Sequence, residues 1–174
     1  MANTFELISS VTAGSGGAAS LDFTSIPNTF TDLCVKYSVR GTNANPYSMM
    51  TLKFNNATSG YSSRGVYGNS SSASSVSYSG LGYMWIGYHE GDTATASTFG
   101  NGELYIPNYA GSTYKSVSID QVSENNSTAG DSAFAFLDAG LWSVTDAINK
   151  ISLINDYGSW KEFSTAYLYG VKNA

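Results

Sequence analysis

The stretch Leu33-Cys34-Val35-Lys36-Tyr37-Ser38-Val39-Arg40 alternates apolar with polar or small side chains along its whole length. Because successive side chains of a β-strand point to opposite faces of a sheet, this period of two predicts a strand that is buried on one face. The side chains expected to face the core are Leu33, Val35, Tyr37 and Val39. Cys34 is the only cysteine and lies on the other face, where we expect a small, partly buried side chain rather than a reactive thiol.

Similar runs follow one another along most of the chain, at spacings typical of sandwiches and jelly rolls. The other segments with strand-forming content are Thr4–Val11, Ala19–Ser25, Ser48–Phe54, Tyr61–Tyr67, Tyr83–Tyr88, Leu104–Ile106, Tyr114–Val122, Ala133–Val144, Ile151–Ile154 and Phe163–Val171. Together they predict about nine to eleven strands in an all-β, jelly-roll-like antiparallel β-sandwich. The 174 residues suffice for a proper core, so we expect a single domain over residues 1–174.

Five segments carry more specific expectations. Ala13–Gly17 is a turn signal, so the strands on either side of it are expected to form a hairpin. The serine-rich stretch Gly68–Ser79 has few apolar anchors and is expected to be a mobile loop. Gly100–Gly102 is expected to interrupt a strand. Ala133–Val144 is apolar throughout, which predicts a strand covered on both faces, and Thr145–Asn149 is expected to form one helical turn.

Charged residues make up only 12% of the chain, so the polar surface must come mainly from Ser, Thr, Asn and Gly. The net charge is −5, and the eight Lys and Arg residues are scattered rather than gathered in a basic stripe. Binding to nucleic acid is therefore not expected. No apolar run approaches the roughly 20 residues that span a bilayer, and no signal-peptide pattern opens the chain, so we expect neither membrane insertion nor secretory export.

Few side chains in this sequence are suited to catalysis. The single histidine, His89, comes at the end of the aromatic run Tyr83–Tyr88 and just before Glu90-Gly91-Asp92, where we expect a solvated loop position. Nucleophilic catalysis needs a base beside a serine or cysteine, and no sequence motif of that kind is present. The sequence therefore predicts no enzyme, no catalytic residue and no cofactor.

Two polar segments could offer oxygen ligands to Ca²⁺. They are Glu90-Gly91-Asp92, and Asn125-Asn126 together with Asp131. Neither matches a loop with defined ligand spacing, and Asx residues in turns more often satisfy local backbone amides. No metal site is therefore predicted.

Aromatic residues are the stronger clue to function, since thirteen Tyr and three Trp exceed what one small core usually needs. Trp85 and Trp142 lie in apolar runs and are assigned to the core. Five others lie near Gly-, Ser- or Asn-rich turns and are candidates for a protein interface or for stacking on sugar rings: Trp160, Tyr157, Tyr61, Tyr78 and Tyr109. Exposure of these rings favours an interface, whereas burial indicates aromatic packing under loops.

Four landmarks follow one another over nearly the whole chain. They are Leu21–Leu33 (LDFTSIPNTFTDL), Glu103–Tyr109, Ala139–Ser143 with Ala147-Ile148 and Ile151–Leu153, and Phe163–Val171 (FSTAYLYGV). Together they resemble a group of small β-sandwich proteins associated with the virions of tailed phages, abundant among marine and cyanobacterial phages. The resemblance implies a jelly-roll-like sandwich in the particle, as a capsid decoration or as a tail or fibre component, and it assigns no functional residue.

These observations predict a non-enzymatic virion structural protein on the outer surface of the particle. The favoured role is a capsid decoration or cement protein that binds the major capsid protein or other virion proteins. Since a small sandwich leaves edge strands exposed and few charges protect them, we also expect self-association, with a trimer favoured. The alternative is a tail-fibre or spike-tip module that binds host surface glycans through the exposed aromatic residues. An enzyme acting on cell-wall polysaccharide is a third, disfavoured class.

Overall fold

The computed structural model describes residues 4–69, 72–127 and 132–172. These ranges contain twelve β-strands and no helix. The strands are β1 (Phe5–Thr12), β2 (Ser20–Phe23), β3 (Asp32–Val39), β4 (Tyr47–Phe54), β5 (Tyr61–Asn69), β6 (Ser72–Leu81), β7 (Met84–Glu90), β8 (Gly100–Pro107), β9 (Lys115–Ser123), β10 (Phe134–Trp142), β11 (Ile151–Asn155) and β12 (Thr165–Val171). The predicted all-β class is confirmed, with more strands than the alternation indicated.

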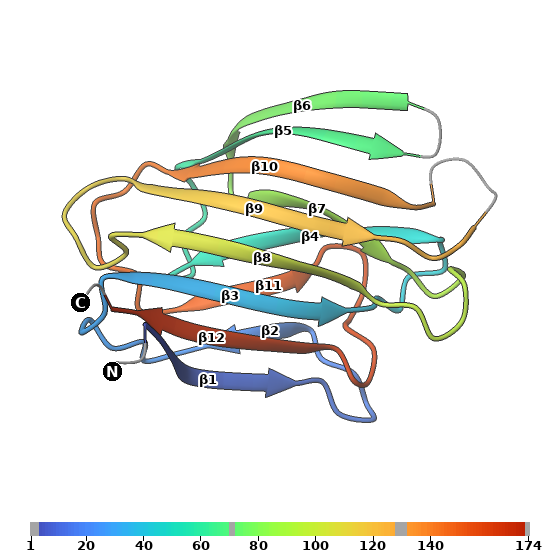
Figure 1. The fold of residues 1–174 in the computed structure, drawn as a ribbon, viewed down its shortest axis with the longest axis horizontal. Coiled ribbons are helices and arrows are strands. Elements are labelled where there is room, and N and C mark those ends of the chain that lie inside the picture. The colour runs from blue at the N-terminus through green and yellow to red at the C-terminus, as the bar shows by residue number, and fades with distance from the viewer. Residues whose placement is uncertain (1–3, 70–71, 128–131, 173–174) are drawn as a thin grey trace.

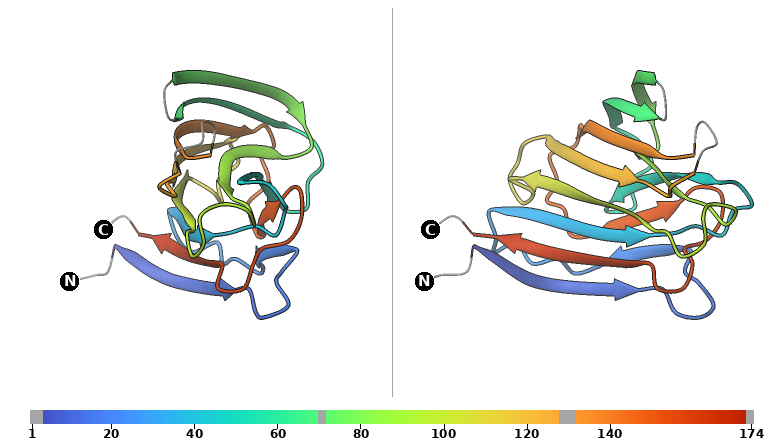
Figure 2. Two further views of the ribbon diagram at one scale, coloured as in Figure 1. Left: turned by 90° about the vertical axis from the view of Figure 1, so that its right-hand side faces the viewer. Right: turned by 45° about the vertical axis from the view of Figure 1, so that its right-hand side comes forward.

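The strands form two antiparallel sheets that pack as a sandwich (Figure 1). The larger sheet has the order β1-β12-β3-β8-β9-β10-β5-β6, and the smaller has the order β2-β11-β4-β7. In Figure 1 the larger sheet faces the viewer, and Figure 2 shows the two layers from the side. The first and last strands, β1 and β12, pair with each other.

The topology of the sandwich is a jelly roll with two added hairpins. Without β5, β6, β9 and β10, the two sheets have the orders β1-β12-β3-β8 and β2-β11-β4-β7. If these eight strands are renumbered along the chain, the orders become 1-8-3-6 and 2-7-4-5, which is the jelly-roll arrangement. The hairpins β9–β10 and β5–β6 extend the first sheet beyond β8 and double its number of strands.

The main core lies between the two sheets. Its composition confirms the predicted inward face of β3, the strand with the clearest alternation. In β3 the four expected side chains are buried: Leu33, Val35, Tyr37 and Val39. Strands β9 and β10 alternate strictly between buried and exposed residues. One face of the larger sheet therefore covers the core, while its other face is open to solvent.

The stretch Gly68–Ser79 is not a loop, because apart from residues 70 and 71, which lie outside the described ranges, it forms most of β6 and the end of β5. Its backbone pairs with β5. Two of its apolar side chains, Val76 and Tyr78, pack against a second buried cluster made by Trp85, Phe134 and Phe136. The sequence pattern did not predict this strand, because only two of its side chains on the packed face are apolar and most of the others are serines.

The turn at Ala13–Gly17 does not close a hairpin, because β1 and β2 belong to different sheets. Strand β1 pairs with β12, and β2 pairs with β11. The chain crosses between the layers here, and its backbone binds another loop. The amide of Ala13 donates to the Ser164 carbonyl at 2.8 Å, and the amide of Ala18 donates to the Trp160 carbonyl at 3.0 Å.

Three further expectations are corrected. Gly100–Gly102 does not interrupt a strand, since β8 runs unbroken from Gly100 to Pro107. Strand β10 is covered on one face only. Thr145–Asn149 contains no helical turn, because the side chain of Asn55 binds its backbone in an extended form. Asn55 Nδ2 donates to the Ala147 carbonyl at 2.8 Å, and Asn55 Oδ1 accepts from the Asn149 amide at 2.9 Å.

Candidate functional site

Three of the five aromatic candidates are buried, so they lack the exposure that an interface or a sugar-stacking site requires. Trp160 and Tyr109 are 0% exposed and Tyr61 is 1% exposed. The phenol of Tyr61 accepts from the Phe54 amide at 2.8 Å, and that of Tyr109 donates to the Pro27 carbonyl. These side chains anchor loops on the core, which is the alternative that the sequence left open.

Trp160 is buried because two distant loops close over it. Its backbone forms isolated β-bridges with both Ala18 and Gly41. The indole Nε1 donates to the Leu153 carbonyl at 3.0 Å, and the ring lies 4.6 Å from that of His89. Such packing depends on residues far apart in the sequence, and the local Tyr-Gly-Ser-Trp pattern gives no sign of it.

The other two candidates, Tyr157 and Tyr78, remain accessible and lie near further tyrosines. Tyr157 is 65% exposed, in the turn after β11. It lines a depression of about 520 Å³, here called the tyrosine groove, whose lining residues are Asn45, Pro46, Tyr47, Ser48, Met49, Tyr88 and Tyr157. Tyr78 is half-buried on β6, and its ring lies 5.4 Å from that of Trp85 in the cluster beside the groove.

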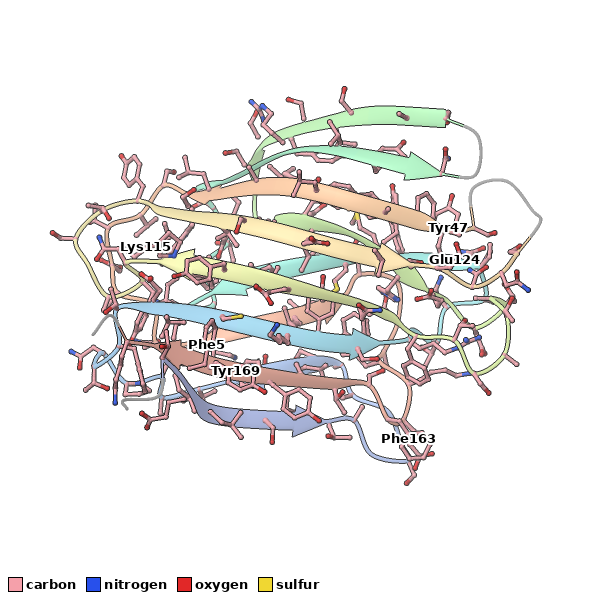
Figure 3. The ribbon with its side chains drawn as sticks, viewed as in Figure 1. Phe5, Tyr47, Lys115, Glu124, Phe163 and Tyr169 are labelled. Atoms are coloured by element: carbon pink, nitrogen blue, oxygen red, sulfur yellow. The ribbon has the colours of Figure 1, made fainter. Side chains whose placement is uncertain are left out.

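The solvent-facing side of the larger sheet, here called the outer face, carries most of the exposed large apolar side chains. They are Phe5, Leu7, Val66, Val122, Leu137, Leu141 and Tyr167. Two patches result, since Phe5 lies against Tyr169 at the β1–β12 edge (Figure 3) and Leu137 pairs with Val66 across β10 and β5. Leu137 is 62% exposed and Val66 is 55% exposed.

A polar band separates the two apolar patches of the outer face. Lys36 forms an ion pair with Glu103, and Glu103 stands opposite Asp120 in the neighbouring strand. These residues line a shallow depression of about 580 Å³ that ends at Leu137. Next to it, a depression of about 340 Å³ over Val66, Val122 and Leu137 continues the apolar patch.

Cys34 is on the same face of β3 as Lys36, beside the polar band, and is 0% exposed because its cross-strand neighbours Tyr105 and Tyr169 flank it. Burial, and then the negative charge of Glu103, raise the pKa of this thiol to about 11. A thiol with so high a pKa is a poor nucleophile at neutral pH. The cysteine is thus a small core-like residue, and it is more completely buried than the sequence suggested.

His89 does not lie in a solvated loop, as expected, but inside β7 and 0% exposed. Burial lowers its pKa to about 4, so the ring is neutral at pH 7. Nδ1 lies 2.9 Å from the Glu90 carbonyl, and because a carbonyl only accepts, Nδ1 carries the proton. Among the residues that the structure describes, Nε2 has no hydrogen-bond partner.

Other charged groups are buried at structural positions that the alternation did not reveal. Arg40 binds the loop between β7 and β8 through the carbonyls of Asp92, Ala94, Thr95 and Thr98, at 2.8–3.2 Å. Lys115 is 0% exposed and donates to the carbonyls of Gly111 and Thr113. Each cation thus holds the backbone of a neighbouring loop in place through several carbonyl groups.

Within the described ranges, no three His, Cys, Asp or Glu side chains are grouped so that they could hold a metal ion. Of the segments considered for Ca²⁺, Glu90 is buried and Asp92 pairs with Lys161, which lowers the pKa of Asp92. Asp131 lies outside the described residues. In the part of the chain that the structure describes, no helix has the length and apolarity needed to cross a bilayer.

Comparison with known proteins identified no related protein or structure. No family model, no curated protein and no solved structure matches the chain. The outer face and the tyrosine groove are therefore assigned from their own residues alone. Sequence reasoning missed the outer face because β10 was expected to be buried on both sides, although Leu137 and Leu141 alternate with its core residues.

Proposed function

We propose that this chain is a non-enzymatic structural protein of a phage particle that decorates the capsid by docking its outer face on coat-protein subunits. The observation that carries the proposal is the apolar area exposed on the outer face, including Leu137, Val66, Leu7 and Phe5. Contiguous exposed apolar surface on a small protein usually marks a binding surface. The resemblance of its sequence landmarks to virion-associated proteins supplies the setting.

The outer face is large enough for a stable contact. Eight strands about 4.8 Å apart, each about eight residues long, span roughly 34 Å by 26 Å, or about 900 Å². A standard interface buries about 800 Å² on each partner. The two added hairpins provide half of this width, so an eight-stranded jelly roll alone would offer only half the surface.

The chemistry of the outer face suits recognition of protein rather than reaction with a substrate. Apolar patches at both sides supply the buried area, and the band at Lys36, Glu103 and Asp120 supplies charges that can select a partner. The buried state of His89 and the high pKa of Cys34 support a role without catalysis. We further propose that copies of the chain associate with one another, with a trimer as the favoured state.

The test uses particles produced without the protein and decorated afterwards with the purified chain. Leu137→Lys places a cation in the apolar patch formed by Leu137 and Val66. The negative charge of Asp120, opposite position 137 on β9, can pair with this cation. Leu7→Lys places a cation at the β1 edge, and Tyr114→Lys is the matched control because Tyr114 is exposed to a similar extent, 58%, just before β9.

We expect the Leu137→Lys chain to co-sediment with particles at least tenfold more weakly than the parent, and the control to bind normally. Decoration by the parent should also raise the resistance of the particles to heat. Equal binding of both outer-face variants and the parent would contradict docking through this face. Failure of the folded parent chain to bind would contradict the decoration role itself.

A further inference from the structure

We infer that the tyrosine groove is a binding site for a neutral saccharide. This site is separate from the outer face and does not depend on the proposed docking. Its lining comes from the start of β4, from β7 and from the turn after β11, none of which belongs to the larger sheet. In Figure 3, Tyr47 lies toward the opposite end of the sandwich from Phe5 and Tyr169.

The groove presents partly exposed aromatic rings whose positions are fixed from behind. Tyr47 and Tyr88 are half-buried, with ring centroids 5.1 Å apart. Phe134 supports both of them, at 5.2 Å from each ring, and Trp85 supports Tyr88 at 5.6 Å. Rings held in this way lose little conformational freedom when a ligand stacks on them, which favours binding.

The polar groups of the groove are neutral, and this selects the class of ligand. Its lining combines phenol hydroxyls, the Asn45 amide and the aliphatic side chains of Pro46 and Met49, without any charged residue. Sugar rings offer apolar C–H faces to aromatic rings and hydroxyl groups to amides and phenols. Asp156 is exposed next to Tyr157, so acidic sugars, phosphate and sulfate are disfavoured.

The hydroxyl group of Tyr88 remains protonated, and so able to donate a hydrogen bond, at neutral pH. Burial, together with nearby phenols such as Tyr78 and Tyr47, raises the pKa of Tyr88. The volume of about 520 Å³ lies in the range of small-ligand sites. The groove is thus sized for a short oligosaccharide rather than for a large polymer surface. The aromatic set differs from the one expected from sequence, since Tyr47 and Tyr88 replace the buried Trp160, Tyr61 and Tyr109.

The experiment applies the purified full chain to an array of neutral and acidic oligosaccharides, and then measures the best neutral hit by titration calorimetry. We expect hits among the neutral sugars. Tyr157→Ala should weaken that binding at least tenfold, whereas Tyr157→Phe, which keeps the ring, should stay within about threefold of the parent. Tyr114→Ala is the control, since it removes an exposed tyrosine outside the groove and should leave binding unchanged.

Three outcomes would overturn the inference. The first is a folded parent chain that binds no neutral saccharide at millimolar concentration. The second is recognition of acidic sugars alone, which contradicts the charge argument. The third is saccharide binding that survives Tyr157→Ala, or that Tyr114→Ala removes equally, since the sugar would then bind elsewhere.

Discussion

Asp138 points into the core from β10 and is 4% exposed. In the described part of the chain, neither of its carboxylate oxygens has a hydrogen-bond partner. Burial raises its pKa from 3.8 to about 7. The carboxyl group occupies the space over Gly65 on β5, where an added Cβ would lie 1.4 Å from Asp138 Oδ1. Glycine at position 65 is therefore required by a side chain on the neighbouring strand rather than by a turn.

The raised pKa of Asp138 makes stability depend on pH. Since the folded protein binds this proton more tightly than the unfolded chain, its contribution is complete below about pH 4 and is lost as the pH rises through 7. Asp138→Asn keeps the shape without the charge. We expect the variant and the parent to be similarly stable at pH 4.5, and the variant to be more stable at pH 8, by on the order of 3 kcal/mol.

Urea unfolding of both proteins across this range measures the difference directly. The lowered pKa of His89 makes stability rise with pH between about pH 4 and 6.5, opposite to the effect of Asp138. Because both proteins contain His89, its contribution cancels in the difference between them. A stability difference that does not change with pH would contradict the assignment of a buried, protonated Asp138.

The buried ring of His89 fills space against Trp160, with the ring centroids 4.6 Å apart. We expect His89→Ala to lower the free energy of unfolding by about 2–4 kcal/mol, because it leaves a cavity in a closed part of the core. Urea unfolding checks this value, with Tyr114→Ala as an exposed control that should change stability by less than about 0.5 kcal/mol. A similarly small effect of His89→Ala would show that the ring is not packed as described.

At the scale of elements, the clear alternation in β3, β9 and β12 predicted strands that the structure contains. Periodicity identifies a strand when many of its side chains pack on one face. It missed most of β6, which has only Val76 and Tyr78 to bury and is otherwise Ser, Ala and Gly before Leu81. It also missed the burial of Trp160 and His89, because loops from other parts of the chain cover them.

Strand β6 is an edge of the larger sheet that carries neither a charged residue nor a proline. Edges of this kind pair readily with another strand, and natural proteins usually protect them with lysine, proline or bulges. The opposite edge, β1, is better protected, since it contains the charged Glu6. Both edge pairs have one irregularity in register, between Leu7 and Ser9 in β1 and between Tyr61 and Ser62 in the partner of β6. Within β6, the Tyr78 carbonyl accepts a hydrogen bond from Arg64 at 2.9 Å.

We therefore expect the self-association of this chain to use the β6 edge. The double variant Ser75→Lys, Ser77→Lys should be monomeric in sedimentation velocity experiments at micromolar concentration. Lysine at Ser116 and Ser118 is the matched control, because these serines face solvent in the middle of the same sheet. A monomeric parent, or an equal effect of the control, would count against pairing through β6.

At the scale of the whole molecule, the two added hairpins change what a jelly roll can do. They widen one sheet from four strands to eight, while the other sheet keeps four. The asymmetry leaves a broad outer face on one side of the sandwich, with two apolar patches and a charged band between them. On the other side, the second aromatic cluster under β5 and β6 supports the tyrosine groove. The proposed docking and the inferred saccharide binding therefore use different surfaces of the molecule.

The decisive measurement is a cryo-EM reconstruction of particles that carry the protein, at a resolution that separates β-strands. The proposed docking predicts the jelly roll on the outer surface of the capsid, with its eight-stranded sheet facing the coat and Leu137 and Val66 within the contact. The four-stranded sheet and the tyrosine groove should face solvent. A reconstruction in which the eight-stranded sheet faces solvent, or in which the chain occupies only the tail, would contradict the proposed function.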